Sequence, residues 1–270
     1  MEYRMDLELN GKVALVSGGS KGIGKAVARR LGLEGANVAI AARSEKTLHD
    51  TANELAEETG QRILPIITDT GDDQSVRAMV DTAHHEFGQI DILVNSAAVP
   101  GGGERPPKLD DITAEAFWSD MNVKVLGYLR AAQAVAPHMI TQGWGRIINI
   151  SGLGARSSGS TIGSMRNVSV SAMTKNLADE LGPHGINVTV VHPGMTFTER
   201  SPDMFKARAD TENISIEEAE LQFKNRNSIR HLVTAEEVAD VITFLASPRS
   251  IAINGDAIAA GGGVGTAIHY

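Results

Sequence analysis

Residues 12–31 read KVALVSGGSKGIGKAVARRL, a short apolar run followed by a glycine-rich turn and then by an amphipathic stretch. The run 12–17 is almost continuously apolar, which predicts a buried strand. Gly18, Gly22 and Gly24 follow at the point where this strand turns into a helix. Glycine there permits a tight turn and lets backbone N–H groups approach a pyrophosphate at the positive end of the helix. The stretch therefore predicts a phosphate-binding strand–turn–helix unit.

Outward from this unit, short apolar runs alternate with longer amphipathic stretches. The predicted strands are 12–17, 37–42, 62–67, 91–96, 146–151, 187–192 and 256–260. The predicted helices are 22–34, 45–58, 73–88, 114–140, 163–182 and 235–246. Near-continuous apolar strands are typical of a parallel sheet covered on both faces, and their alternation with helices predicts a doubly wound α/β fold of about seven strands.

No linker divides the chain, so we expect one domain over 1–270. PGGGERPP (100–107) is a predicted loop. The segment 196–232 is long and polar and has no strand pattern. It is the best candidate for a lid over a site at the carboxyl ends of the strands.

Composition excludes several classes of function. The formal net charge of the 270 residues is −8, which argues against binding to nucleic acid or to an anionic membrane, because phosphate contacts need clustered Lys and Arg. The chain has no cysteine, so disulfides, thiol catalysis and Cys-ligated metals are excluded. No His, Asp or Glu cluster has metal-ligand spacing, and no segment is apolar enough to span a membrane. We expect a cytoplasmic protein without a metal.

Several further pieces of sequence fit one family pattern. They are SGGSKGIG (17–24), Asp69 after the third strand, NSAA (95–98), GRIINIS (145–151), HPGMTFT (192–198) and INGDAIAAGGG (253–263). With them the chain resembles the short-chain dehydrogenase/reductase family over nearly its whole length. The resemblance implies a Rossmann-type fold, a nicotinamide cofactor, a small-molecule substrate, and a homotetramer or homodimer.

The residues after the second strand indicate which nicotinamide cofactor is preferred. Enzymes that prefer NAD place an acid at the end of this strand to hold the ribose 2′-OH. Here Ala42 takes that position and Arg43 follows it, while Lys21 precedes the second glycine of the turn. Two cations without a carboxylate suit a 2′-phosphate, for which Arg offers a planar fork. The sequence therefore favours NADP(H), although both cations would also be ordinary as solvated charges.

The resemblance also implies which residues contact the cofactor. Asp69 and Thr70 would flank the adenine, Asn95 would lie on the adenosine ribose side, and Thr198 would contact the carboxamide. The full predicted cofactor set is Gly18, Ser20, Lys21, Gly22, Ile23, Gly24, Arg43, Asp69, Thr70, Asn95, Ala97, Asn167, Pro193, Gly194 and Thr198.

The resemblance fails at the catalytic positions, where members of the family normally use Asn, Ser, Tyr and Lys. LADELGPHGINVTVVHPG (177–194) fixes the register of the helix before it, and Gly163 then falls at the Tyr and Asn167 at the Lys. Ser151 is present, but Gly152 falls where the catalytic Ser usually lies. The chain therefore lacks the usual Tyr–Lys pair of the family.

The position of the usual Asn depends on the alignment. Anchoring on Gly127 and Pro137 places Lys124 there, whereas anchoring on Asn122 alone keeps an Asn but shifts the downstream residues by two. We prefer the first alignment. It predicts that Lys and Asn have exchanged helices and that both point into one pocket.

Our hypothesis is a rewired polar site made of Lys124, Ser151 and Asn167. A desolvated Lys has a lowered pKa and acts as an acid or base, so Lys124 would supply a cation and a proton. Asn167 would bond the nicotinamide ribose, and Ser151 would orient a substrate oxygen. The alternative is a decayed site in which Lys124 is only a helix-surface charge. Tyr128 is a weaker candidate for the missing phenol, and Arg166 for a clamp on an anionic substrate.

Three functions fit these residues. The first is an NADP(H)-dependent oxidoreductase that transfers hydride to or from a carbonyl, imine or activated alkene with a non-standard proton donor. In that enzyme Gly163 would leave space for a bulky substrate. The second is a redox-neutral lyase or isomerase that binds NADP(H), and the third is a catalytically silent binding subunit. Bound nucleotide without turnover would distinguish the third from the first two.

Overall fold

Strand β1 (Val13–Ser17), which precedes the glycine turn, lies inside a parallel sheet of seven strands. This computed structural model describes residues 5–98, 106–266 and 268. The strand order is β3-β2-β1-β4-β5-β6-β9, and every neighbouring pair is parallel. The other strands are β2 (Asn37–Ala42), β3 (Ile63–Ile67), β4 (Ile92–Asn95), β5 (Gly145–Ile150), β6 (Ile186–Pro193) and β9 (Ala257–Ala260). The predicted doubly wound fold and its seven strands are confirmed.

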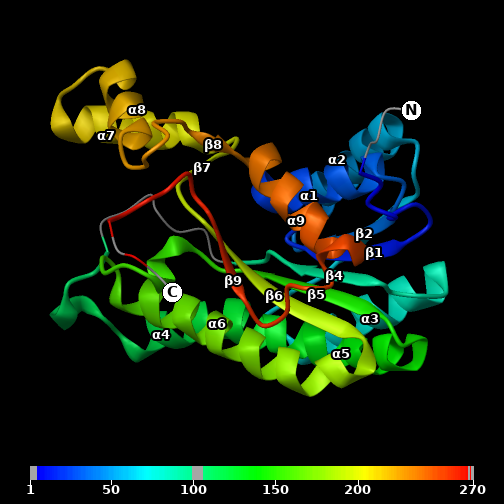
Figure 1. The fold of residues 1–270 in the computed structure, drawn as a ribbon. Helices are drawn as coiled ribbons and strands as arrows, with labels where there is room; N and C mark the ends of the chain where they lie inside the picture. The colour runs from blue at the N-terminus through cyan, green and yellow to red at the C-terminus, as the bar shows by residue number, and fades with distance from the viewer. Residues whose placement is uncertain (1–4, 99–105, 267, 269–270) are drawn as a thin grey trace.

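Helices cover both faces of the sheet (Figure 1). One face packs against α1 (Gly22–Leu33), α2 (Glu45–Thr59) and α9 (Ala235–Ala246). The opposite face packs against α3 (Asp73–Phe87), α5 (Gly127–Gln142) and α6 (Thr161–Leu181). Each face has its own cluster of buried apolar side chains, because the side chains of each strand point alternately to the two faces.

The long helix predicted over 114–140 is interrupted. It consists of α4 (Ala114–Met121), the π-helical turn η2 (Asn122–Leu126) and α5. At the start of the π turn the carbonyl oxygen of Asn122 accepts a hydrogen bond from the Arg130 side chain, at 3.2 Å. Gly127 packs so closely on the main chain of Thr70 that a Cβ there would lie 2.9 Å from its oxygen. The wider turn changes the direction of the side chains that η2 presents to the sheet.

Helix α6 begins two residues earlier than predicted, because the Ser160 side chain caps it by accepting from the Gly163 amide. The carboxyl ends of the parallel strands lie at one edge of the sheet, where β1 leads into α1 and β5 leads toward α6. Most of the predicted loop 100–107 lies outside the described residues.

The polar segment 196–232, predicted to have no strand, begins with a two-residue strand and also contains two helices. β7 (Thr196–Phe197) pairs with β8 (Val233–Thr234), and between them lie α7 (Ser201–Glu212) and α8 (Ile216–Lys224). Two-residue strands are too short to produce an alternating pattern. Figure 1 shows α7 and α8 standing away from the sheet, beyond the β7–β8 pair.

Candidate active site and cofactor-binding edge

The glycine turn between β1 and α1 forms a tight cradle. Gly18 has a φ of 71°, and a Cβ there would lie 2.8 Å from the Ala97 nitrogen, just beyond β4. A Cβ on Gly24 would lie 2.2 Å from the Gly18 oxygen. Both positions therefore need glycine for close approach of main chains. The turn predicted from sequence has the geometry of a phosphate-binding loop.

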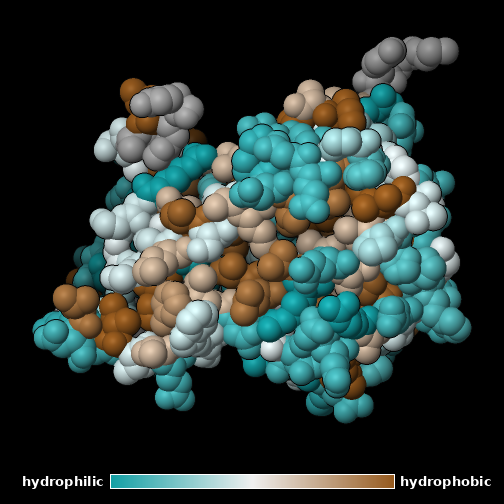
Figure 2. All heavy atoms as spheres, turned by 90° about the horizontal axis from the view of Figure 1, so that it is seen from below, coloured by the Kyte–Doolittle hydropathy of each residue, from teal (hydrophilic) through white to brown (hydrophobic). Residues whose placement is uncertain are grey.

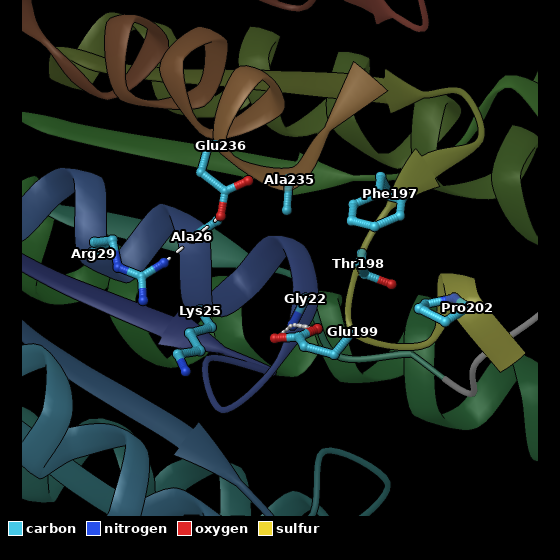
Figure 3. Close-up of a pocket in the computed structure, with 10 residues that line it drawn as sticks. All are labelled: Gly22, Lys25, Ala26, Arg29, Phe197, Thr198, Glu199, Pro202, Ala235 and Glu236. Carbon is cyan, nitrogen blue, oxygen red and sulfur yellow. Dashed lines mark hydrogen bonds and ion pairs between the residues drawn. The ribbon is translucent and has the colours of Figure 1, made fainter. Parts of the chain in front are cut away.

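The first amide of α1 already holds an anion. The Gly22 N–H donates to both carboxylate oxygens of Glu199, at 3.1 and 3.3 Å, and Figure 3 shows this carboxylate directed at the helix end. Lys21, the residue before the helix, makes no side-chain cap. A helix N-terminus attracts negative charge through its free N–H groups. The residues present therefore fit the pyrophosphate of a dinucleotide.

The two predicted cations lie at the same edge. Lys21 and Arg43 are exposed, and Arg43 follows directly after β2. Neither has an ion-pair partner among the residues that the structure describes. Both are available to an anionic group beyond β2.

Other predicted cofactor residues differ in what their side chains can reach. Asn95 is 0% exposed; its Nδ2 donates to Asn149 Oδ1, and its own Oδ1 has no hydrogen-bond partner among the described residues. The Thr70 hydroxyl is likewise committed, because it donates to the Val123 oxygen. Asp69 is exposed. The predicted place of Asn95 on the adenosine ribose side stays a prediction.

The remaining members of the set surround the same turn. Ser20 and Ile23 belong to it, and the Ser20 oxygen accepts from Thr51. Gly194 lies against Gly261 so closely that a Cβ would be 2.9 Å from its Cα. Pro193 ends β6, and the Thr198 methyl group is 3.6 Å from where a Gly22 Cβ would be. The segment 193–198 therefore lies against the glycine turn.

Lys124, Ser151 and Asn167 form one buried cluster, as the preferred alignment predicts. The Lys124 Nζ donates to the Ser151 main-chain oxygen at 2.9 Å and to Asn167 Oδ1 at 3.2 Å. The Ser151 hydroxyl donates to the Asn167 main-chain oxygen at 3.0 Å. Lys124 is 4% exposed, so it is not the surface charge of the alternative interpretation.

The other alignment does not match this geometry. Asn122 lies away from the cluster, because its Nδ2 donates to the Gly71 oxygen and its Oδ1 accepts from Arg130. Within the π turn, Asn122 therefore bonds to the loop after β3, whereas Lys124 bonds to Asn167.

Burial lowers the pKa of Lys124 from its usual value to about 7. The positive charge of Arg166 lowers this pKa further, whereas the Asp120 carboxylate opposes the change. The two neighbours form an ion pair at 2.5 Å between α4 and α6. This pair was not predicted as part of the site, although Asp120 is one helical turn before Lys124 in the sequence. Arg166 is held by Asp120, which weakens the expectation that it clamps a substrate.

Tyr128 cannot replace the missing phenol. Its side chain is 1% exposed, and its hydroxyl donates to the Ile150 oxygen at 3.0 Å. Burial raises the pKa of Tyr128 well above its usual range. Tyr128 therefore packs in the core with Val170 and Val190.

His192 is a buried neutral side chain next to the cluster. Burial and the charges of Arg156 and Lys124 lower the pKa of His192 to about 4. The Gly152 amide donates to Nδ1 at 3.4 Å, and Nε2 lies 3.4 Å from the Ser171 hydroxyl. These contacts give His192 a positioning role for the strand end.

The space expected at Gly163 is smaller than predicted. A Cβ at Gly163 would lie 2.9 Å from the Ser160 hydroxyl, so the capping side chain takes up part of the room. Within the described ranges no group of three or more acidic or histidine side chains is placed to hold a metal ion. No helix in the described part of the chain is long and apolar enough to cross a membrane.

The fold and the glycine cradle define a dinucleotide-binding protein of the Rossmann type. The sequence matches the family described as enoyl-(acyl carrier protein) reductase over residues 18–265. It is 33% identical over 253 residues to the short-chain reductase protein NovJ of Streptomyces niveus, a match that covers 93% of each chain. The chain belongs to the short-chain dehydrogenase/reductase family of oxidoreductases.

Solved structures of oxidoreductases have the same fold. L-sorbose reductase from Gluconobacter frateurii, in complex with NADPH and L-sorbose, superposes with a TM-score of 0.91 and 27% identity, covering 98% of this chain and 100% of that one. A single-residue variant of actinorhodin polyketide ketoreductase with NADPH superposes with a TM-score of 0.87 and 32% identity, covering 95% of this chain and 98% of that one.

Proposed function

We propose that the protein is an NADP(H)-dependent oxidoreductase in which Lys124 exchanges the proton with the substrate. The observation that carries this proposal is the hydrogen bond between the buried Lys124 and Asn167. The substrate would be a small molecule with a carbonyl, imine or activated alkene group. When bound, the cofactor supplies or accepts the hydride. The NADPH in the structures of L-sorbose reductase and actinorhodin ketoreductase supports this choice of cofactor.

The hydrogen bonds of Lys124 leave it able to move a proton in either direction. Two of its N–H groups are used by the Ser151 oxygen and by Asn167. A protonated amine has a third N–H to donate, and a neutral amine has a lone pair to accept. With a pKa of about 7, both forms of Lys124 are populated near neutral pH. Lys124 would therefore protonate the product in reduction and take up a proton in oxidation.

Asn167 and Ser151 would act as positioning residues. Asn167 Oδ1 accepts from Lys124, which leaves the Asn167 amide nitrogen to donate to the nicotinamide ribose. Ser151 fixes the main chain of Asn167. The segment 196–232, with α7 and α8, would act as the lid over the substrate.

Arg43→Ser is expected to weaken NADPH binding about tenfold and to leave NADH binding unchanged, because a charge-assisted bond to the 2′-phosphate is lost. The measurement is the Kd of each nucleotide by titration calorimetry. Lys46→Ser is the control, since Lys46 is an exposed cation nearby that pairs with Asp50 instead. An equal loss of affinity for both nucleotides would show that Arg43 does not bind the 2′-phosphate of NADPH.

We also propose that the protein forms a homotetramer or homodimer through α4, η2 and α6. These helices expose Trp118, Leu126, Met165 and Val168, and Trp118 is 62% exposed. Figure 2, which views the molecule from below, shows hydrophobic side chains gathered on this face. A second copy would cover such a patch.

We also propose a cytoplasmic location for the protein, which fits the absence of cysteine from its sequence.

Trp118→Glu is expected to reduce the mass measured by light scattering from a multiple of 28.6 kDa to that of one chain. A charge in an apolar interface is left without a partner. Leu33→Glu, which places a charge at an exposed apolar position of α1, is expected to leave the assembly intact. A wild type that already has the mass of one chain would contradict the proposal.

Two alternatives stay open within the same fold. A redox-neutral lyase or isomerase would convert substrate while leaving the amount of NADPH unchanged, and a silent subunit would bind NADPH without turnover. NADPH consumption with ketones, enones and imines distinguishes both from an oxidoreductase.

A further inference from the structure

Glu199 occupies the place at which the proposed cofactor needs an anion-binding site. Its carboxylate accepts from the first amide of α1, and the two residues are 177 positions apart in the chain. Figure 3 shows Glu199 beside Thr198, with its carboxylate turned toward Gly22. The same end of α1 would hold the pyrophosphate, because the glycine cradle places the main chain there. Two anions cannot use this helix end together without repulsion.

The helix end is the main stabilising partner that the structure gives to Glu199. In the described part of the chain, Glu199 has no ion pair with Lys, Arg or His. The cations of the neighbouring cavity have other partners, since Lys25 pairs with Glu54 and Arg29 pairs with Glu54, Glu58 and Glu236. Displacing Glu199 would therefore break its hydrogen bonds to α1, but it would not break an ion pair.

Glu199 is attached to the first turn of a segment with its own apolar core. The Thr198 amide donates to the Ser201 hydroxyl, and the Ser201 amide donates to the Thr198 oxygen, so the residues around Glu199 move as one turn. Beyond it, Phe205, Phe223 and Leu232 pack together in a cluster separate from the core of the sheet. Glu199 is therefore joined to the start of α7 through this hydrogen-bonded turn.

We propose that Glu199 is an internal competitor of the cofactor pyrophosphate, which holds the start of α7 on the α1 N-terminus until a nucleotide displaces it. This inference rests on the proposed function, since it assumes that a dinucleotide binds at the glycine turn. It couples nucleotide binding to the position of the segment proposed as the lid. Glu199 on Gly22 fixes the start of α7, and a nucleotide that displaces Glu199 would free it.

Glu199→Gln tests the competition, because Gln keeps the size of the side chain and removes its charge. NADPH is expected to bind the variant about tenfold more tightly than the wild type, the difference that a charged hydrogen-bond partner makes. In the nucleotide-free variant, hydrogen exchange measured by mass spectrometry is expected to be faster in peptides covering 18–24 and 199–206. Glu236→Gln is the control, since Glu236 lines the same cavity but pairs with Arg29.

The outcomes separate this inference from the proposed function. Tighter NADPH binding and faster exchange in Glu199→Gln, with Glu236→Gln like the wild type, would support the competition. NADPH affinity that is unchanged or weaker in Glu199→Gln would overturn it and leave the proposed cofactor in place. A wild type and a variant that both fail to bind NADPH would overturn the proposed function and the competition together.

Discussion

Lys124→Met lowers the rate of NADPH-dependent reduction by about 10³-fold and leaves the Kd for NADPH nearly unchanged, because the variant loses the proton donor and not the glycine cradle. Met has a similar length and keeps the apolar packing of the side-chain stem. The measurement is NADPH oxidation under saturating substrate, with nucleotide binding checked by titration calorimetry. Lys175→Met is the matched control, since Lys175 lies on α6, is exposed and pairs with Asp179.

The same variant changes the dependence of the rate on pH. The pKa of Lys124 is lowered to about 7, so Lys124 is protonated below this pH and neutral above it. Reduction needs the protonated form, and its rate is therefore expected to fall as pH rises through about 7. Oxidation needs the neutral form and is expected to rise over the same range. Lys124→Met should show neither change, and full turnover in this variant would remove Lys124 from the mechanism.

Gly24→Ala is expected to weaken NADPH binding about 100-fold, at the upper end of the cost of overpacking. A Cβ at this position would lie 2.2 Å from the Gly18 oxygen, and main-chain atoms on both sides must move to admit it. The movement would shift the amides that face the phosphate. The measurement is the Kd for NADPH, with circular dichroism to show that the variant is folded.

Gly32→Ala is the control for this substitution, because it lies in the same helix. There the added Cβ would meet the Thr59 side chain, with Cγ2 at 2.8 Å and Cβ at 3.0 Å, so α2 has to give way while the glycine turn is not touched. We expect NADPH affinity close to that of the wild type. Equal affinity in Gly24→Ala and the wild type would show that the turn does not bind the nucleotide through its close main-chain approach.

The fold could be predicted because its strands are buried on both faces. All five residues of β1 (VALVS) and all four of β4 (ILVN) are buried, and each appears in the sequence as an apolar run that only its last residue ends. The π turn at Asn122–Leu126 could not be predicted, since it depends on Arg130 bonding to the Asn122 oxygen and on Gly127 packing against Thr70. The contact of Gly127 with Thr70 joins distant parts of the chain, and an Arg eight residues after an Asn is not a recognised sequence signal.

The site could be predicted in part. Alignment of two helices placed Lys124 and Asn167 in one pocket, and the structure joins them by a hydrogen bond. The sequence did not show that Asn95 Nδ2 bonds to Asn149, because the partner of a buried polar residue depends on its neighbour across the sheet. Glu199 was missed because its contact with Gly22 joins distant parts of the chain, and a Glu after a Thr is ordinary in a polar loop.

NADPH oxidation by the purified wild type, measured across ketones, enones and imines, tests the proposed function most directly. We expect at least one of these classes to be reduced, with the loss of absorbance at the nicotinamide band matching the product formed. Tight NADPH binding with no reduction in any class would contradict an oxidoreductase and favour a subunit that only binds the nucleotide.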